Sequence, residues 1–104
     1  MIRVRFHTAD DAIVGFTLSG HAGAGTHGQD IVCAAVSSAA YMTANTVTEI
    51  IGAPADITVD DGYMALQVTD NAAGCQELFS GFRLHLQALQ EQYPTRIQLM
   101  NTEV

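Results

Sequence analysis

The spacing of the apolar residues changes along this chain of 104 residues, and the change restricts the folds that are open to it. Ile2, Val4 and Phe6 alternate with charged or polar neighbours, which is the period of a strand with one buried face. The alternation resumes over residues 14–18, after a turn-like segment, and ends near Ser19. The chain therefore begins with two strands that we expect to pair as an antiparallel hairpin.

The spacing then becomes helical from about residue 31 to residue 51. Asp30 is a good N-cap for this helix, and Gly52 followed by Pro54 is typical of a helix end. The apolar positions with helical spacing are Val32, Val36, Ala39, Thr43, Val47 and Ile50.

The second half of the chain contains a further predicted hairpin and helix. Residues 57–59 and 64–68 flank an Asp61-Gly62 turn and predict a second hairpin. A second helix follows, with Asp70 or Asn71 as its cap and Pro94 after its end. Its apolar face carries Cys75, Leu78, Phe79, Phe82, Leu86 and Leu89.

A last alternating segment over residues 96–100 completes the order β-β-α-β-β-α-β. We therefore predict an α+β fold over residues 1–104, as a single domain with two helices packed on a largely antiparallel sheet. His85 lies at the edge of the second helix's apolar face, where we expect a packed residue.

Composition excludes some classes of function. Eleven acidic residues against four arginines and no lysine give a net charge of −7, which argues against nucleic-acid binding and favours a basic partner. The first residues contain no apolar core of a signal peptide, and we expect that no run approaches the length needed to cross a bilayer. We therefore expect a cytoplasmic protein whose two cysteines are thiols.

The richest chemistry lies at the start of the first predicted helix. Cys33 falls in its first turn, directly after a glycine-rich loop that contains His21 and His27. A helix N-terminus and a nearby imidazolium ion both favour the thiolate form of a cysteine, which is the nucleophilic form. His21 follows the predicted strand end at Gly20 and would be held more firmly than His27, so we favour His21 as the base.

Each of these residues also has a simpler interpretation. A cysteine in a helical turn is often a small buried hydrophobe, and Cys75 on the second helix fits that description. Asp30 is first of all an N-cap, with a second role in orienting the base as an alternative. Zinc binding by His21, His27 and Cys33 is weakly indicated because no second Cys/His pair is present, so we expect no metal and no cofactor.

At these residues the chain resembles the ribosomal-processing cysteine protease family, Prp. The resemblance is carried by Gly20-His21-Ala22, then a short glycine-containing loop, then residues 28–37 with the sequence GQDIVCAAVS. Over the rest of the chain it rests on length, element order and the Asp61-Gly62 hairpin. The chain departs from common members at Gln29, where lysine is frequent, and in carrying His27.

The resemblance implies a cysteine endopeptidase with Cys33 as nucleophile and His21 as general base. It implies a substrate as well, the basic N-terminal segment of a large-subunit ribosomal protein, from which a short extension is removed. It further implies a homodimer, and a glycine-rich loop that orders around the substrate. The loop glycines concerned are Gly23, Gly25 and Gly28.

Two other functions are consistent with the residues alone. A non-catalytic ribosome-assembly module could bind the same basic segment without cutting it. A thiol-redox protein is disfavoured because Cys33 has no C-x-x-C partner and Cys75 belongs to the other helix.

Overall fold

The structure, a computed structural model, describes residues 1–20 and 31–104. Its elements follow the predicted order, with two short helical segments added. The strands are β1 (Ile2–Ala9), β2 (Ala12–Ser19), β3 (Ala55–Asp60), β4 (Tyr63–Val68) and β5 (Ile97–Glu103). The helices are α1 (Ile31–Asn45), the π-helical η1 (Thr46–Ile51), the 3₁₀ turn η2 (Ala72–Cys75) and α2 (Gln76–Gln92).

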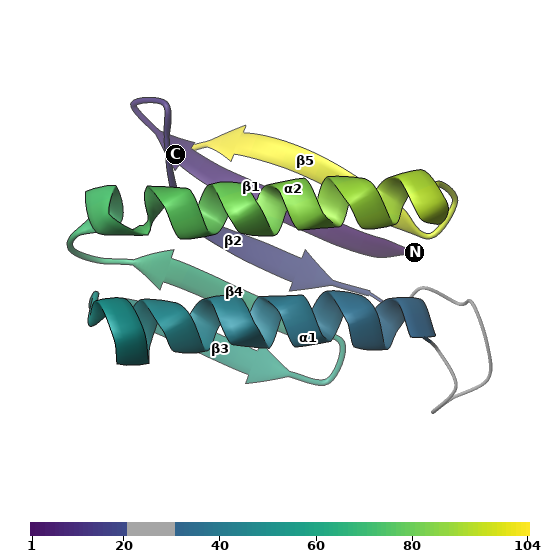
Figure 1. The fold of residues 1–104 in the computed structure, drawn as a ribbon, viewed down its shortest axis with the longest axis horizontal. Coiled ribbons are helices and arrows are strands. Elements are labelled where there is room, and N and C mark those ends of the chain that lie inside the picture. The colour runs from purple at the N-terminus through teal and green to yellow at the C-terminus, as the bar shows by residue number, and fades with distance from the viewer. Residues whose placement is uncertain (21–30) are drawn as a thin grey trace.

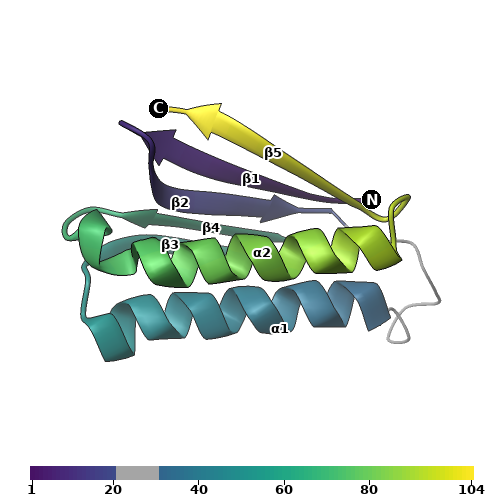
Figure 2. The same ribbon diagram turned by 45° about the horizontal axis from the view of Figure 1, so that its top comes forward.

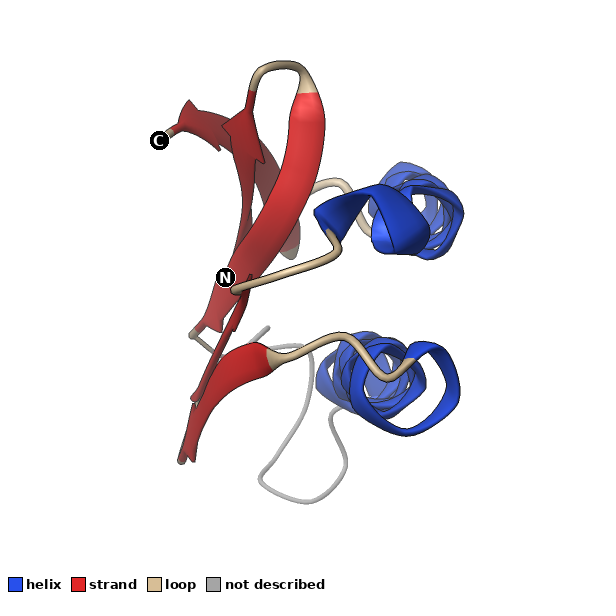
Figure 3. Ribbon diagram, turned by 90° about the vertical axis from the view of Figure 1, so that its left-hand side faces the viewer, coloured by secondary structure: helices blue, strands red, loops and turns tan. Residues whose placement is uncertain are grey.

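The five strands form one sheet in the order β3-β4-β2-β1-β5 (Figure 1). Three of the four neighbouring pairs are antiparallel, and only β1 and β5 run parallel. Both long helices cover the same face of the sheet, and no other element of residues 1–20 and 31–104 covers the opposite face (Figures 2 and 3). The predicted α+β architecture with a largely antiparallel sheet is confirmed.

The core lies between the sheet and the two helices. Val4 and Phe16 from the sheet and Val36 from α1 are fully buried in it. The ring of Phe82 on α2 lies 5.9 Å from that of Phe6 and 4.8 Å from that of Phe16, measured between centroids. These aromatic contacts fix α2 over the centre of the sheet.

A β-bulge in the first hairpin alters the expected pattern of burial. Thr8 pairs with Ile13 but His7 pairs with Gly15, so Val14 is an extra residue on β2. Ile13 is buried in consequence, whereas Val14 is only partly buried. The simple alternation predicted from Val14 onward is therefore wrong at its first residue.

The first helix spans the predicted residues 31–51 but changes type within them. It is α-helical to Asn45 and π-helical beyond, where the wider turn carries Ile50 out to 79% exposure. Ile50 is therefore not a core position. The hydroxyl groups of Thr46 and Thr48 donate to carbonyl groups four residues back, a bond that competes with regular α-helix. Gly52 ends the helix with a φ of 74°, as predicted.

The helical segment Ile31–Ile51 has 21 residues and a mean hydropathy of 1.2, enough by length and composition to cross a membrane. The expectation that no run approaches that length is therefore wrong. The segment owes its apolar character to its packing, because Val32, Val36 and Ala40 belong to the hydrophobic core. In this fold it is the helix on the β3–β4 side of the sheet (Figure 1), and it leaves β3 itself largely exposed.

The second helix begins later than predicted. Asn71 adopts a left-handed φ of 63° ahead of η2, and its side chain does not cap the helix. Instead the Gln76 side-chain amide accepts from the Ile13 N–H at 2.9 Å and donates to the Ile13 carbonyl at 2.7 Å. The helix ends at Gln92, before Pro94, as predicted. His85 is exposed and not packed, because it points away from the face that carries Leu86.

Candidate active site

The two cysteines occupy very different environments. Cys33 lies in the first turn of α1, where it is half-buried and packs against the core. Cys75 is fully buried at the start of α2, with its thiol 3.6 Å from the Asn71 carbonyl oxygen. Burial raises the pKa of the Cys75 thiol. The starts of the two helices lie at opposite ends of the helical layer (Figure 1), and both cysteines are thiols.

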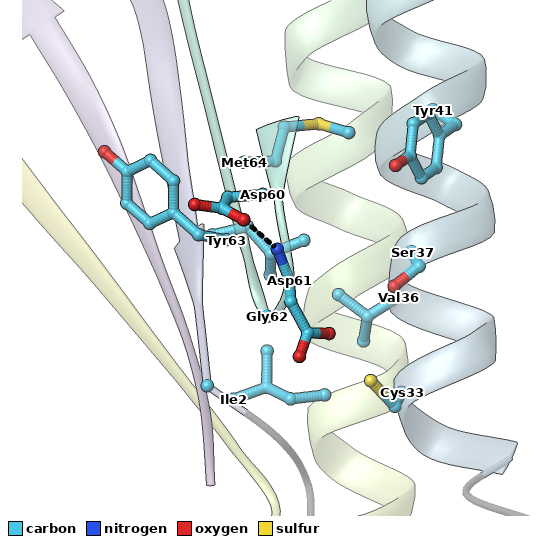
Figure 4. Close-up of a pocket in the computed structure, with 12 residues that line it drawn as sticks. Ile2, Cys33, Val36, Ser37, Tyr41, Asp60, Asp61, Gly62, Tyr63 and Met64 are labelled. Carbon is cyan, nitrogen blue, oxygen red and sulfur yellow. Dashed lines mark hydrogen bonds between the residues drawn. The ribbon is translucent and has the colours of Figure 1, made fainter. Parts of the chain in front are cut away.

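Cys33 forms part of the wall of a pocket of about 250 Å³ (Figure 4). The pocket lies between the first turns of α1, the β3–β4 hairpin and the end of β2 that leads toward α1. Its wall is apolar on the sheet side and polar at the hairpin. The lining residues are Ile2, Leu18, Gly20, Cys33, Val36, Ser37, Tyr41, Asp60, Asp61, Gly62, Tyr63 and Met64.

A backbone hydrogen bond fixes the side of the pocket that faces Cys33. The Gly20 N–H donates to the Gly62 carbonyl oxygen at 2.9 Å and so joins the end of β2 to the hairpin turn. Gly20 has a φ of 94°, and a Cβ added to it would lie 2.4 Å from the Met1 carbonyl oxygen. Only glycine fits at position 20, because any other residue would be strained at this φ and its Cβ would collide with the Met1 carbonyl oxygen.

One carboxylate from the hairpin turn, that of Asp61, gives the pocket a negative charge. The Asp61 N–H donates to the Asp60 carboxylate at 2.8 Å, which stiffens the turn. The Asp61 side chain extends from the turn toward the part of the pocket where Cys33 lies (Figure 4). The sequence interpretation treated Asp61 only as a turn residue, since its proximity to Cys33 depends on the packing of α1 over β3 and β4. A cation in this pocket would be favoured.

Ser37 and Tyr41 follow Cys33 at intervals of four residues and line the same pocket. Residues four apart lie on one side of a helix, so α1 presents a continuous Cys33-Ser37-Tyr41 edge to the hairpin. Neither residue was given a role in the site from the sequence, although Ser37 ends the motif that carries the family resemblance. The helical interval from Cys33 is the signal that could have found them.

Of the predicted site residues, the structure describes only Cys33. The base His21, its alternative His27, the cap Asp30 and the loop glycines Gly23, Gly25 and Gly28 lie outside the described residues. Gly20 and Cys33, on either side of that segment, both line the pocket. Among the described residues, no three His, Cys, Asp or Glu side chains are grouped so as to hold a metal ion.

Comparison with known proteins places this pocket in a family. A sequence model of the family described as cysteine protease Prp matches residues 1–98. The chain belongs to this family. Prp proteins are cysteine proteases, and the half-buried thiol of Cys33 is the group in the described pocket that suits such chemistry.

Two kinds of similarity support the assignment to the Prp family. The ribosomal processing cysteine protease Prp of Bacillus subtilis is 28% identical over 97 residues, which cover 86% of this chain and 87% of that protein. A crystal structure of the Staphylococcus aureus ribosomal processing protease Prp, in complex with a covalently linked product peptide, superposes with a TM-score of 0.91. The two are 28% identical, and the match covers 98% of this chain and 100% of that one.

The S. aureus protein is also known in complex with a substrate peptide. That structure gives a TM-score of 0.85 at 27% identity, again covering 98% of this chain and 100% of that one. The whole described fold is therefore that of a Prp protease, including the hairpin and helix that form the pocket.

Proposed function

We propose that this cysteine protease removes a short N-terminal extension from a large-subunit ribosomal protein, with Cys33 as the nucleophile and His21 as the general base and acid. The position of Cys33 carries the proposal. Its side chain is the only thiol on the wall of the described pocket, whereas Cys75 is fully buried in the core. The names of the relatives, ribosomal processing proteases, supply the substrate class.

The proposed reaction follows from the chemistry of a thiol and an imidazole. His21 takes the proton of the Cys33 thiol, and the thiolate attacks the carbonyl carbon of the scissile bond. The protonated imidazole then gives that proton to the leaving amine as the C–N bond breaks, which leaves a thioester on Cys33. Water, activated by the same imidazole, hydrolyses the thioester and restores the thiol.

Two features of the described residues support these steps. Cys33 lies in the first turn of α1, where the positive end of the helix dipole favours both the thiolate and the oxyanion of the tetrahedral intermediate. The Asp61 carboxylate extends into the same pocket, and a negative charge there favours the cationic imidazolium. Asp30 as N-cap would keep the start of the helix in place.

The partner and its location form part of the proposal. A net charge of −7 suits a substrate segment that is basic, as ribosomal proteins are. Ribosome assembly takes place in the cytoplasm, and we propose that location for this protein together with a homodimeric state. Sedimentation of the purified protein tests the dimer, and cell fractionation tests the location.

Mass spectrometry of the ribosomal protein after incubation with purified enzyme tests the activity. We expect the wild-type chain and Cys75→Ala to release the N-terminal extension, and Cys33→Ala to release none. His21→Ala should lose activity while His27→Ala retains most of it, and the reverse result would make His27 the base. Binding of the ribosomal protein with no product from the wild-type chain would instead support the non-catalytic assembly module.

A further inference from the structure

One strand of the sheet leaves apolar side chains uncovered on the face that carries the helices. Ile57 and Val59 of β3 pair with Leu66 and Met64 of β4, and paired residues project to the same side of an antiparallel sheet. Leu66 and Met64 are 2% and 3% exposed under the helices, yet Ile57 and Val59 are 40% and 50% exposed. The helical layer thus stops short of β3 and leaves an apolar strip along it.

This strip begins at the Cys33 pocket and continues beside α1. Met64, the partner of Val59, lines the pocket together with Tyr41, which is 46% exposed. From Cys33 to Tyr41 the helix rises by about 12 Å. From Asp61 back to Ile57 the strand covers about 13 Å. The helix edge from Cys33 to Tyr41 and the strand edge from Asp61 to Ile57 are therefore similar in length. An extended peptide lying between them would span this length with about four residues.

The backbone of β3 can bind such a peptide in addition to its side chains. β3 is the outermost strand on its side of the sheet. An edge strand directs the N–H and C=O groups of alternate residues outward, where an extended segment can pair with them. Peptide recognition by strand addition combines these backbone bonds with contacts to alternate side chains.

The charge of the residues near the strip determines which kind of peptide segment can bind to it. Residues 56–61 carry three aspartates, Asp56, Asp60 and Asp61, and no lysine or arginine lies between residues 6 and 82. The four arginines lie in β1, in α2 and immediately before β5, away from the β3 edge of the sheet. A second copy of the acidic β3 edge would be repelled, whereas a basic side chain near Asp61 would be attracted.

We infer that the strip formed by Ile57, Val59 and Tyr41 is the substrate-docking surface of the proposed protease. An extended segment with apolar side chains lies along β3, and a basic residue of the same segment lies at Asp61. This inference rests on the proposed function and adds the residues that select the substrate. It assigns to β3 a role in recognition and none in the reaction itself.

Binding measured in the absence of cleavage tests the apolar part of the surface. A fluorescent peptide of the ribosomal protein's extension is titrated with full-length Cys33→Ala protein, with and without Ile57→Ser and Val59→Ser together. Loss of two apolar contacts should raise the Kd roughly tenfold or more. Leu84→Ser on α2 is the matched control, since Leu84 is 67% exposed, and it should leave the Kd within about twofold.

A second pair of variants tests the charged part. Asp61→Asn removes the charge that extends toward Cys33 and leaves the backbone bond of residue 61 to the Asp60 carboxylate in place, so it should weaken binding of the basic peptide. The same variant should not weaken binding of a peptide whose basic residues are replaced by alanine. Glu77→Gln, an exposed acid on α2, is the control and should have no effect on either peptide.

The outcomes separate this inference from the proposed function. Suppose that the wild-type chain cleaves the ribosomal protein, but that the β3 variants bind the peptide as tightly as the control variant does. The inferred docking surface is then wrong, whereas the protease assignment stands. A β3 change that alters only sedimentation, and not peptide binding, would make the strip an interface between copies and would also overturn the inference. If the β3 variants fail to fold, amide exchange decides, because peptide binding to Cys33→Ala must slow exchange within β3.

Discussion

The backbone N–H of Gly20 donates to the carbonyl oxygen of Gly62 at 2.9 Å, and both glycines adopt a positive φ. The bond joins the end of β2 to the β3–β4 turn, and both residues line the pocket of Cys33. The chain therefore enters the segment that holds His21 from a fixed point on the pocket wall. Two glycines far apart in sequence thus position the approach to the proposed active site.

Replacement of Gly20 by alanine tests this relationship. The left-handed φ and the 2.4 Å approach to the Met1 carbonyl oxygen should make Gly20→Ala about 1–3 kcal/mol less stable, with a loss of protease activity. Gly81→Ala is the control, because a Cβ at Gly81 in α2 meets nothing within 4 Å. It should stabilise the protein by about 0.5–1 kcal/mol. Urea unfolding measures both effects, and a Gly20→Ala protein as stable as the wild type would contradict the argument.

The two thiols should differ in reactivity toward an alkylating reagent. Cys33 is half-buried on a pocket wall, whereas Cys75 is fully buried and burial raises its pKa, which lowers its thiolate fraction. Native protein treated with iodoacetamide should therefore be modified at Cys33 first, and Cys75 should react only after unfolding. Peptide mapping by mass spectrometry locates the label. Modification of Cys75 ahead of Cys33 would show that the burial described for these residues is wrong.

His7 should make the stability of the protein depend on pH. Its ring lies 2.7 Å from the Thr17 hydroxyl, and burial, aided by the charge of Arg5, lowers its pKa below the ordinary 6.5. The folded state therefore resists protonation of His7, so its stability is unaffected above about pH 6.5 and falls as the pH drops below that value. His7→Gln does not titrate there and should lose less stability between about pH 7.5 and pH 5. Equal losses in urea unfolding at the two pH values would contradict the assignment.

Gln76 should contribute to stability through its two bonds to Ile13. Gln76→Glu keeps the shape of the side chain but loses the donor, so that a carboxylate would face the carbonyl oxygens of Ile13 and Ala72. We expect a loss of about 1–3 kcal/mol. Gln87→Glu, an exposed position on the same helix, should change stability by less than about 0.5 kcal/mol. Similar values for the two variants would show that the Ile13 bonds contribute little.

The order of elements could be predicted from the sequence because each segment carries a period of its own. Alternation in β1 and helical spacing in α2 are local signals, and the structure confirms both. The bulge at Val14 could not be predicted, because it depends on which residue of β1 each residue of β2 faces. The exposure of Ile50 depends on a change of helix type that threonine hydroxyls favour, which the apolar pattern alone does not report.

The position of Cys33 in the candidate site could be predicted from the sequence, but the residues that surround it in the pocket could not. The first-turn position of Cys33 follows from the local sequence of α1, and the structure confirms it. Asp61 and Met64 join the pocket of Cys33 only because α1 packs beside the second hairpin, a contact between segments far apart in the chain. The three aspartates of residues 56–61 are visible in the sequence, but the position of β3 at the edge of the sheet required the strand order.

The central claim is that the sulfur of Cys33 becomes covalently bonded to the substrate. Rapid acid quenching of the enzyme with a substrate peptide, followed by tandem mass spectrometry, detects such a thioester and assigns it to a residue. We expect the acyl group of the cleaved peptide on residue 33 and none on Cys75 or in the Cys33→Ala protein. Cleavage of the substrate by Cys33→Ala, or an acyl group found on Cys75, would contradict the account.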